Sequence, residues 1–140
     1  DKYNPFTLKG NAAPGLTQLM FESLLTGTLD EPATAYGLLA EDVSVSADGR
    51  AVTFRLRSQA RFHNGAPVLA SDVKHSFDTL ISPLAAPQFR TLYAEVVAAT
   101  VLDARTIRSA QRQSGVAPDH WRHARFQSRM GTQRPEPQTL

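Results

Sequence analysis

The sequence contains no cysteine, and it has no apolar run of the length that crosses a membrane. The absence of cysteine excludes a disulfide framework and a thiolate metal site. A spanning helix needs about 18 or more consecutive apolar residues, so we expect no membrane span. The chain opens at Asp1 without the pattern of a signal peptide, which predicts a mature or cut fragment.

Residue arrangements that carry catalysis are also missing. The sequence shows no Ser-His-Asp set, no pair of carboxylates on one helix and no glycine-rich phosphate loop. The segment LKGNAAPG holds two glycines, but their spacing is not that of a phosphate loop. We therefore expect neither an enzyme nor a bound cofactor.

The length of 140 residues predicts one domain, yet its charge is unevenly divided. Residues 1–108 hold ten Lys or Arg and eleven Asp or Glu, a net charge of −1. Residues 109–140 hold five Arg and two acids, a net charge of +3, and they are rich in Gln, Arg, Ser and Pro. Such a composition cannot bury enough apolar surface to offset the entropy of ordering, which predicts a disordered tail.

Candidate ligands for other partners lie in that tail. His120 and His123 are three residues apart, but two histidines without a third ligand make a weak metal site, so we expect no metal. Trp121, Phe126 and the arginines could bind nucleic acid through stacking and charge. A small basic protein that binds nucleic acid or an acidic partner is thus the alternative function, but without a fold to present these side chains we expect no nucleic-acid binding. His63 and His75 are isolated and are predicted to lie on the surface.

Residues 42–57 alternate between apolar and polar side chains around the pair Asp48 and Gly49. The apolar positions are Val43, Val45, Val52, Phe54 and Leu56. Period-two alternation predicts half-buried strands, and Asp-Gly supplies the positive φ of a tight turn, so we predict a β-hairpin. Arg55 and Arg57 fall on the opposite face, which is interpreted as a solvated strand surface.

A second turn and a helix follow the hairpin. Asn64 and Gly65 predict the turn, and residues 71–81 carry apolar side chains at helical spacing. These are Val73, Phe77, Leu80 and Ile81. We predict a cap at Ser71 or the residue before it, a stop at Ser82, and packing of Val73, Phe77 and Leu80 on the hairpin.

The remaining elements are read more coarsely. Residues 12–25 have one apolar face and predict an amphipathic helix. Residues 93–101 predict a strand, residues 102–104 a turn, and residues 106–108 the start of a returning strand whose alternation stops at Ser109.

The order of these motifs resembles the extracellular solute-binding proteins of family 5, which serve ABC importers for oligopeptides, dipeptides and nickel complexes. The resemblance is carried by the Asp-Gly hairpin, FRLR, ARFHNGAPV and SDVKHSF, and upstream by NPFTLKGNAAPG and YGLLAE. It covers roughly residues 4–108 and points to the oligopeptide and microcin-C-type branch. Leu69 departs from the family, which usually has a capping Thr there; the loss costs about 1 kcal/mol of capping.

The resemblance implies a mixed α and β (α+β) fold, the N-terminal part of a two-lobed periplasmic-binding-protein-like architecture. Residues 1–25 would start lobe I, residues 26–108 would form its small extra subdomain, and residues 109–140 would be an atypical tail. The implied function is capture of a peptide-like solute for an ABC permease in the inner membrane. The implied location is periplasmic, or extracellular and membrane-associated.

The family resemblance also implies ligand-binding residues. In the family, the loop before the first helix offers backbone groups to an extended ligand, in the manner of strand addition. An aromatic residue after the second helix, by position Phe89 or else Tyr93, lies near the ligand. The implied ligand-binding residues are Leu8, Lys9, Gly10, Asn11, Ala12 and Phe89. Gly10 could also make only the turn into the helix, and the two roles are not exclusive, whereas Phe89 could equally serve ordinary packing in the subdomain.

The change of composition after Arg108 leads to a hypothesis about residues 109–140. The resemblance stops within one or two residues of Arg108, in an expected strand, whereas domain boundaries favour exposed linkers. A natural disordered tail explains the composition but not the break inside a strand. We therefore predict a reading-frame shift near codon 108, which translation of the DNA in the other two frames would test.

Overall fold

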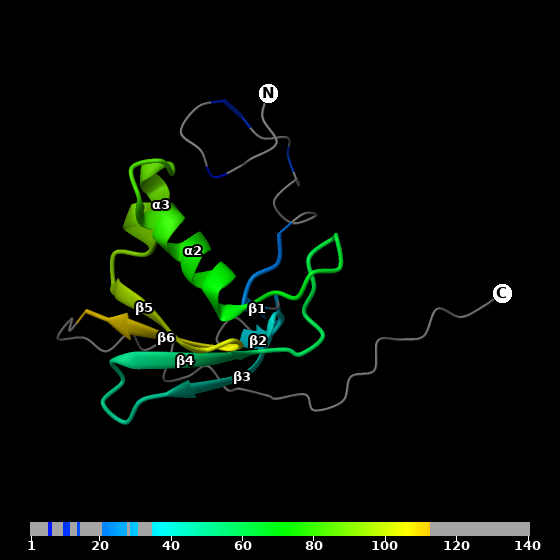
Figure 1. The fold of residues 1–140 in the computed structure, drawn as a ribbon. Coiled ribbons are helices and arrows are strands. Elements are labelled where there is room, and N and C mark those ends of the chain that lie inside the picture. The colour runs from blue at the N-terminus through cyan, green and yellow to red at the C-terminus, as the bar shows by residue number, and fades with distance from the viewer. Residues whose placement is uncertain are drawn as a thin grey trace.

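A computed structural model describes residues 6, 10, 11, 14, 21–27, 29, 30 and 35–112 (Figure 1). In chain order the elements are β1 (Leu25–Gly27), β2 (Ala35–Gly37), β3 (Ala40–Val45), β4 (Ala51–Leu56), α2 (Ala70–Ile81), α3 (Pro87–Leu92), β5 (Val96–Asp103) and β6 (Thr106–Gln111). β1 and β2 pair with each other, and the other strands form one sheet in the order β3-β4-β6-β5. The mixed α and β class predicted from the sequence is confirmed.

The β3–β4 hairpin forms as predicted. Val43 lies opposite Phe54 and Val45 opposite Val52, so the apolar side chains share one face. Gly49 has a φ of 69°, the left-handed value that the Asp-Gly pair predicts. The carboxylate of Asp48 accepts hydrogen bonds from the Ser46 hydroxyl at 2.6 Å and from a backbone N–H at 3.0 Å. These two bonds lower the pKa of Asp48 because they favour its charged form.

β6 lies between β4 and β5, an arrangement that the strand-by-strand prediction did not include. Phe54 pairs with Ile107 in the ladder between β4 and β6. β6 continues to Gln111, so the expectation that the strand pattern stops at Ser109 is wrong. The hydrogen bonds of the ladder continue because the backbone makes them whatever the side chains are.

The second predicted strand is also displaced. β5 begins at Val96 and not at residue 93, and the turn falls at residues 104 and 105. Residues 93–95 form a turn that joins α3 to β5. The apolar run at 93–101 therefore predicted that a strand is present, but it did not predict where the strand begins and ends.

The core lies between the sheet and the helical layer, and α2 lies over β5 and β6 (Figure 1). Its buried side chains are Ala40, Val52, Phe54, Leu56, Ala60, Val68, Ala70 and Ile107. Val73 packs against this cluster, as predicted. Phe77 instead meets Tyr93 edge to face, with ring centroids 6.0 Å apart, so the predicted contact of Phe77 with the hairpin is corrected. The described contacts likewise do not place Leu80 on this cluster.

The ends of α2 differ from prediction at one terminus only. The helix begins after Leu69 and not at Ser71, and Asp72 accepts a hydrogen bond from the Leu69 backbone N–H at 2.8 Å. Leucine has no side-chain acceptor, so the preference for a polar cap predicted a later start, although Leu69 is the position at which the family usually has a capping Thr. Ser82 ends the helix as predicted. The Ala70 N–H donates to the carbonyl of Ala104 at 2.8 Å, which fixes the start of α2 on the β5–β6 turn.

The helix predicted at residues 12–25 lies mostly outside the described residues. Its last part is described and is not helical: residues 21–24 are irregular and Leu25 begins β1. Among the described residues, no helix is both long and apolar enough to cross a membrane.

Candidate functional site

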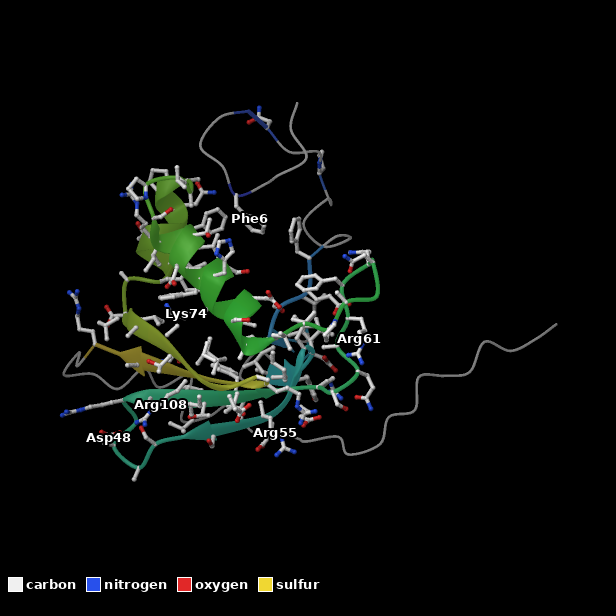
Figure 2. All side chains as sticks on the ribbon, in the orientation of Figure 1. Phe6, Asp48, Arg55, Arg61, Lys74 and Arg108 are labelled. Carbon is white, nitrogen blue, oxygen red and sulfur yellow. The ribbon has the colours of Figure 1, made fainter. Side chains whose placement is uncertain are left out.

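Three phenylalanines join the N-terminal segment to α3. The Phe6 ring lies 5.0 Å from the ring of Phe21 and 5.4 Å from that of Phe89, in both cases edge to face. The Phe6 carbonyl accepts a hydrogen bond from Ala86 N–H at 2.9 Å, just before the first turn of α3. Figure 2 shows Phe6 beside the helical layer. Phe89 therefore packs against Phe6, and its assignment as a ligand-binding residue stays a prediction.

The predicted ligand loop is described only in part. Gly10 and Asn11 are exposed, and Gly10 has a φ of 82°, a value that favours glycine. Leu8, Lys9 and Ala12 lie outside the described residues. Tyr93, the other aromatic considered for the ligand, packs on Phe77. The contact between Phe6 and Phe89 was not predicted from the sequence, because no short-range pattern connects two positions so far apart in the chain.

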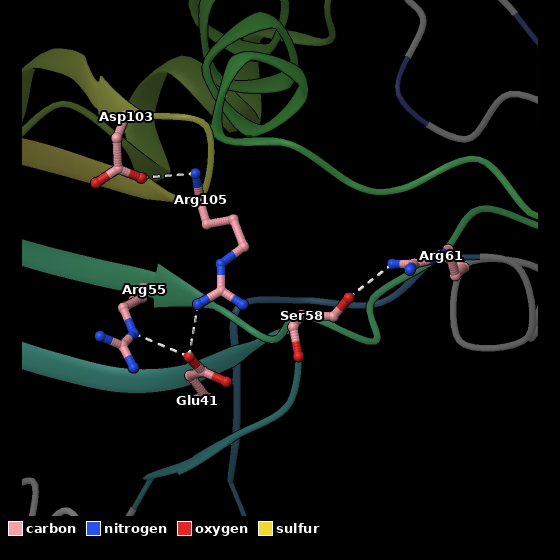
Figure 3. Close-up of polar contacts among 6 residues, drawn as sticks. All are labelled: Glu41, Arg55, Ser58, Arg61, Asp103 and Arg105. Atoms are coloured by element: carbon pink, nitrogen blue, oxygen red, sulfur yellow. Dashed lines mark hydrogen bonds and ion pairs between the residues drawn. The ribbon is translucent and has the colours of Figure 1, made fainter.

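A charged cluster ties one edge of the sheet to the β5–β6 turn (Figure 3). The same carboxylate oxygen of Glu41 lies 2.9 Å from Arg55 Nε and 3.2 Å from a guanidinium nitrogen of Arg105. Asp103 accepts the Arg105 backbone N–H at 2.8 Å. That bond, with a weaker contribution from the Thr106 hydroxyl, lowers the pKa of Asp103. Because these groups are partly exposed, the cluster orients the turn more than it stabilises the fold.

Arg57 has a structural task that its interpretation as a solvated side chain did not include. Its guanidinium donates to the carbonyl of Leu38 at 2.7 Å and to that of Gly37 at 3.1 Å. Its backbone N–H donates to Leu39 at 2.9 Å. Arg57 thus holds the connection between β2 and β3 in place, and Gly37 is the last residue of β2 before that connection.

We expect Gly37→Ala to lower the free energy of unfolding by about 1–3 kcal/mol. A methyl group at this position would clash with the backbone oxygen of Ala40, so the chain must shift. Urea unfolding followed by circular dichroism measures the change. Leu38→Ala is the control, since this neighbouring side chain is exposed and its removal creates no clash. Equal stability of Gly37→Ala and the unmodified chain would contradict the described backbone.

Metal ligands do not gather in the part of the chain that the structure describes. No group of three His, Cys, Asp or Glu side chains there is placed to hold an ion. His63 and His75 are exposed, as predicted. The tail residues His120, Trp121, His123 and Phe126 lie outside the described residues.

Comparison with known proteins identifies the family of this chain. The family model of the bacterial extracellular solute-binding proteins, family 5 (middle region), matches residues 34–122. The chain belongs to this family. The match spans the sheet, both described helices and part of the following segment, so it contradicts the expectation that the resemblance ends at Arg108.

Similarity to individual proteins supports the assignment. The "Probable peptide-binding protein YejA" of Agrobacterium fabrum is 40% identical over 107 residues, which cover 76% of this chain and 17% of the relative. The uncharacterized protein y4wM of Sinorhizobium fredii is 43% identical over 101 residues, covering 71% of this chain and 14% of its own length. The crystal structure of NikA from Brucella suis in complex with Fe(III)-EDTA superposes with a TM-score of 0.65 at 28% identity, covering 79% of this chain and 22% of NikA.

The chain matches only a small part of each of these proteins. The chain spans 14% and 17% of the two curated relatives and 22% of NikA. The described sheet and helices therefore correspond to a minor portion of a typical family 5 protein. A ligand site that draws on other portions cannot be assembled from the described residues.

Proposed function

We propose that this chain forms part of the first lobe of a protein that captures a peptide-like solute and delivers it to an ABC permease. The observation that carries the proposal is the family match over residues 34–122. The peptide class is supported by the name of the Agrobacterium relative, "Probable peptide-binding protein YejA", at 40% identity. The protein would act in the periplasm, without enzymatic activity and without nucleic acid as a partner.

The proposed division of the chain has residues 1–25 as the start of lobe I and residues 26–108 as its small subdomain. Two contacts of the described residues bear on it. The carbonyl of Phe6 accepts the N–H of Ala86, and Leu24 packs on the core of the sheet. The N-terminal segment thus contacts the proposed subdomain both near Phe6 and near Leu24. The tail proposed at residues 109–140 would begin after β6, that is, after Gln111.

The proposed ligand-binding residues are Leu8, Lys9, Gly10, Asn11, Ala12 and Phe89. Gly10 supports this assignment, because it is exposed and has a positive φ, so another backbone can approach it closely. Phe89 has an indirect role in this proposal: its ring holds Phe6, which lies a few residues before the loop. Backbone groups of the loop would then pair with an extended peptide, as strand addition requires.

A chimera tests the proposed loop. Residues 4–112 of this chain would replace the matching segment of the Agrobacterium relative, and peptide binding would be measured by calorimetry. We expect Gly10→Ala in the chimera to weaken binding about tenfold or more, because an added methyl group separates the two backbones. Gly65→Ala is the matched control, since Gly65 has a similar φ of 86° and lies in a turn remote from the loop in sequence.

Two results would contradict the proposed loop. One is unchanged affinity of the chimera carrying Gly10→Ala. The other is an equal loss of affinity with Gly65→Ala, which would show that backbone strain and not ligand contact is responsible.

A further inference from the structure

The strand β5 lies at an edge of the sheet, and most of its length lacks the charged side chains that usually keep other strands from pairing with an edge. Within the part of the chain that the structure describes, β5 pairs on one side only, with β6. Residues 96–102 of this strand carry no charge and no proline, and Asp103 follows at its end. Val97 is 52% exposed and Leu102 is 55% exposed. Long apolar edges of this kind are sites where another strand can add.

The opposite edge, β3, is built differently. It is shorter, and it carries Glu41 and Asp42. Its register shifts between Ala40 and Asp42, a bulge that disturbs pairing with a further strand. Glu41 is held by Arg55 and Arg105, so a charged cluster occupies this edge. Charges and bulges are the usual means by which sheets block association, and β3 has both.

β5 also has irregularities, but they lie toward its ends. Its register against β6 shifts between Val96 and Ala98 and again between Val101 and Asp103. The stretch from Ala98 to Val101 pairs without interruption. A partner strand would therefore pair regularly with Ala98–Val101 and would reach Val97 at the first of the two shifts. The interface would be small, as in weak and concentration-dependent complexes.

The sequence of β5 is complementary to itself. In an antiparallel pair related by a two-fold axis, a residue can face its own copy, so a pair centred on Ala99 places Val97 opposite Val101 of the partner subunit. Both valines are exposed, at 52% and 36%, and β-branched pairs across strands are favourable. The net charge of the whole chain is only +2, so repulsion between two copies is weak.

We propose that two copies of this chain associate through antiparallel pairing of their β5 strands, which joins the two sheets into one. Strand β3 takes no part in the contact. The inference is independent of the proposed solute and of the ligand loop, because it uses only the sheet and its edges.

Sedimentation equilibrium of the full chain from micromolar to millimolar concentration tests the proposal. We expect a dimer that dissociates on dilution, and we expect Val97→Lys to raise its dissociation constant about tenfold or more. Val45→Lys is the matched control: Val45 lies on β3 and is 48% exposed, so the same charge enters the other edge. Its dissociation constant should match that of the unmodified chain. Circular dichroism checks that each variant is folded.

A cross-link gives a second measurement that does not depend on added charge. The chain has no cysteine, so a single introduced thiol reports one contact. Ala99→Cys should form a disulfide-linked dimer on mild oxidation, since residues opposite each other in antiparallel strands have Cα atoms about 4.5–5.5 Å apart. Ser44→Cys on β3 should remain largely monomeric. A monomer at all concentrations, an equal effect of Val45→Lys, or equal cross-linking at both positions would overturn the proposal.

Discussion

Phe54→Ala is expected to lower the free energy of unfolding by about 3–5 kcal/mol. Phe54 is only 8% exposed and belongs to the core cluster together with Val52 and Leu56. In the sheet it lies between Val43 on β3 and Ile107 on β6, so its removal leaves a cavity at the centre of the ladder. Urea unfolding followed by circular dichroism gives the change.

Phe62→Ala is the matched control for this substitution, because it removes the same side chain from a position that is 45% exposed. We expect it to cost less than about 1 kcal/mol. If Phe54→Ala also cost less than about 1 kcal/mol, the apolar face of the hairpin would not be the core, and the described sheet would be contradicted.

The chain on its own is expected to bind short peptides with a dissociation constant weaker than about 1 mM. Ligand pockets bury about 70–90% of a ligand's surface. This chain spans 17% of the Agrobacterium relative and 22% of NikA, and under the proposed function the rest of such a protein supplies the remaining surface around the ligand. Calorimetric titration with a pool of short peptides measures the affinity, and a dissociation constant in the micromolar range or tighter would refute this expectation.

Elements fixed by neighbouring residues were predictable from the sequence. The β3–β4 hairpin follows from period-two alternation around Asp48 and Gly49, and both the turn and the register agree with it. The end of α2 at Ser82 follows from the proline after it. In each case the physical cause lies within a few residues along the chain, where a single sequence carries the information.

Elements fixed by distant residues were not predictable. The insertion of β6 between β4 and β5 depends on pairs such as Phe54 with Ile107, which are far apart in the chain. The start of α2 is fixed by Ala70 bonding to Ala104, and its N-cap Leu69 precedes the cap that local preference predicted at Ser71 or the residue before it; only the family resemblance pointed to position 69. Tertiary contacts decided these boundaries over local preference.

The candidate site shows the same division. The family resemblance named Gly10 as a loop residue, and its positive φ is a property of that single residue. The packing of Phe89 on Phe6 joins α3 to the N-terminal segment, and only the folded chain brings the two rings together. Arg57 was assigned to solvent because strand alternation says nothing about carbonyl groups in a neighbouring connection.

The reading-frame hypothesis for residues 109–140 stays a prediction with a changed position. β6 runs to Gln111 and the family match reaches residue 122, so a shift at codon 108 itself disagrees with both. Any departure from the family pattern would have to begin farther along the chain. Translation of the DNA in the other frames, started after codon 122, is the corresponding test.

Under the proposed function, this chain supplies one part of a peptide-binding lobe and needs the rest of a family 5 protein to bind. The most direct test is calorimetry of one peptide pool titrated into the isolated chain and into the chimera with the Agrobacterium relative. We expect no measurable binding by the chain and binding by the chimera at the affinity of that relative. Micromolar binding by the chain alone, or a folded chimera that binds no peptide, would contradict it.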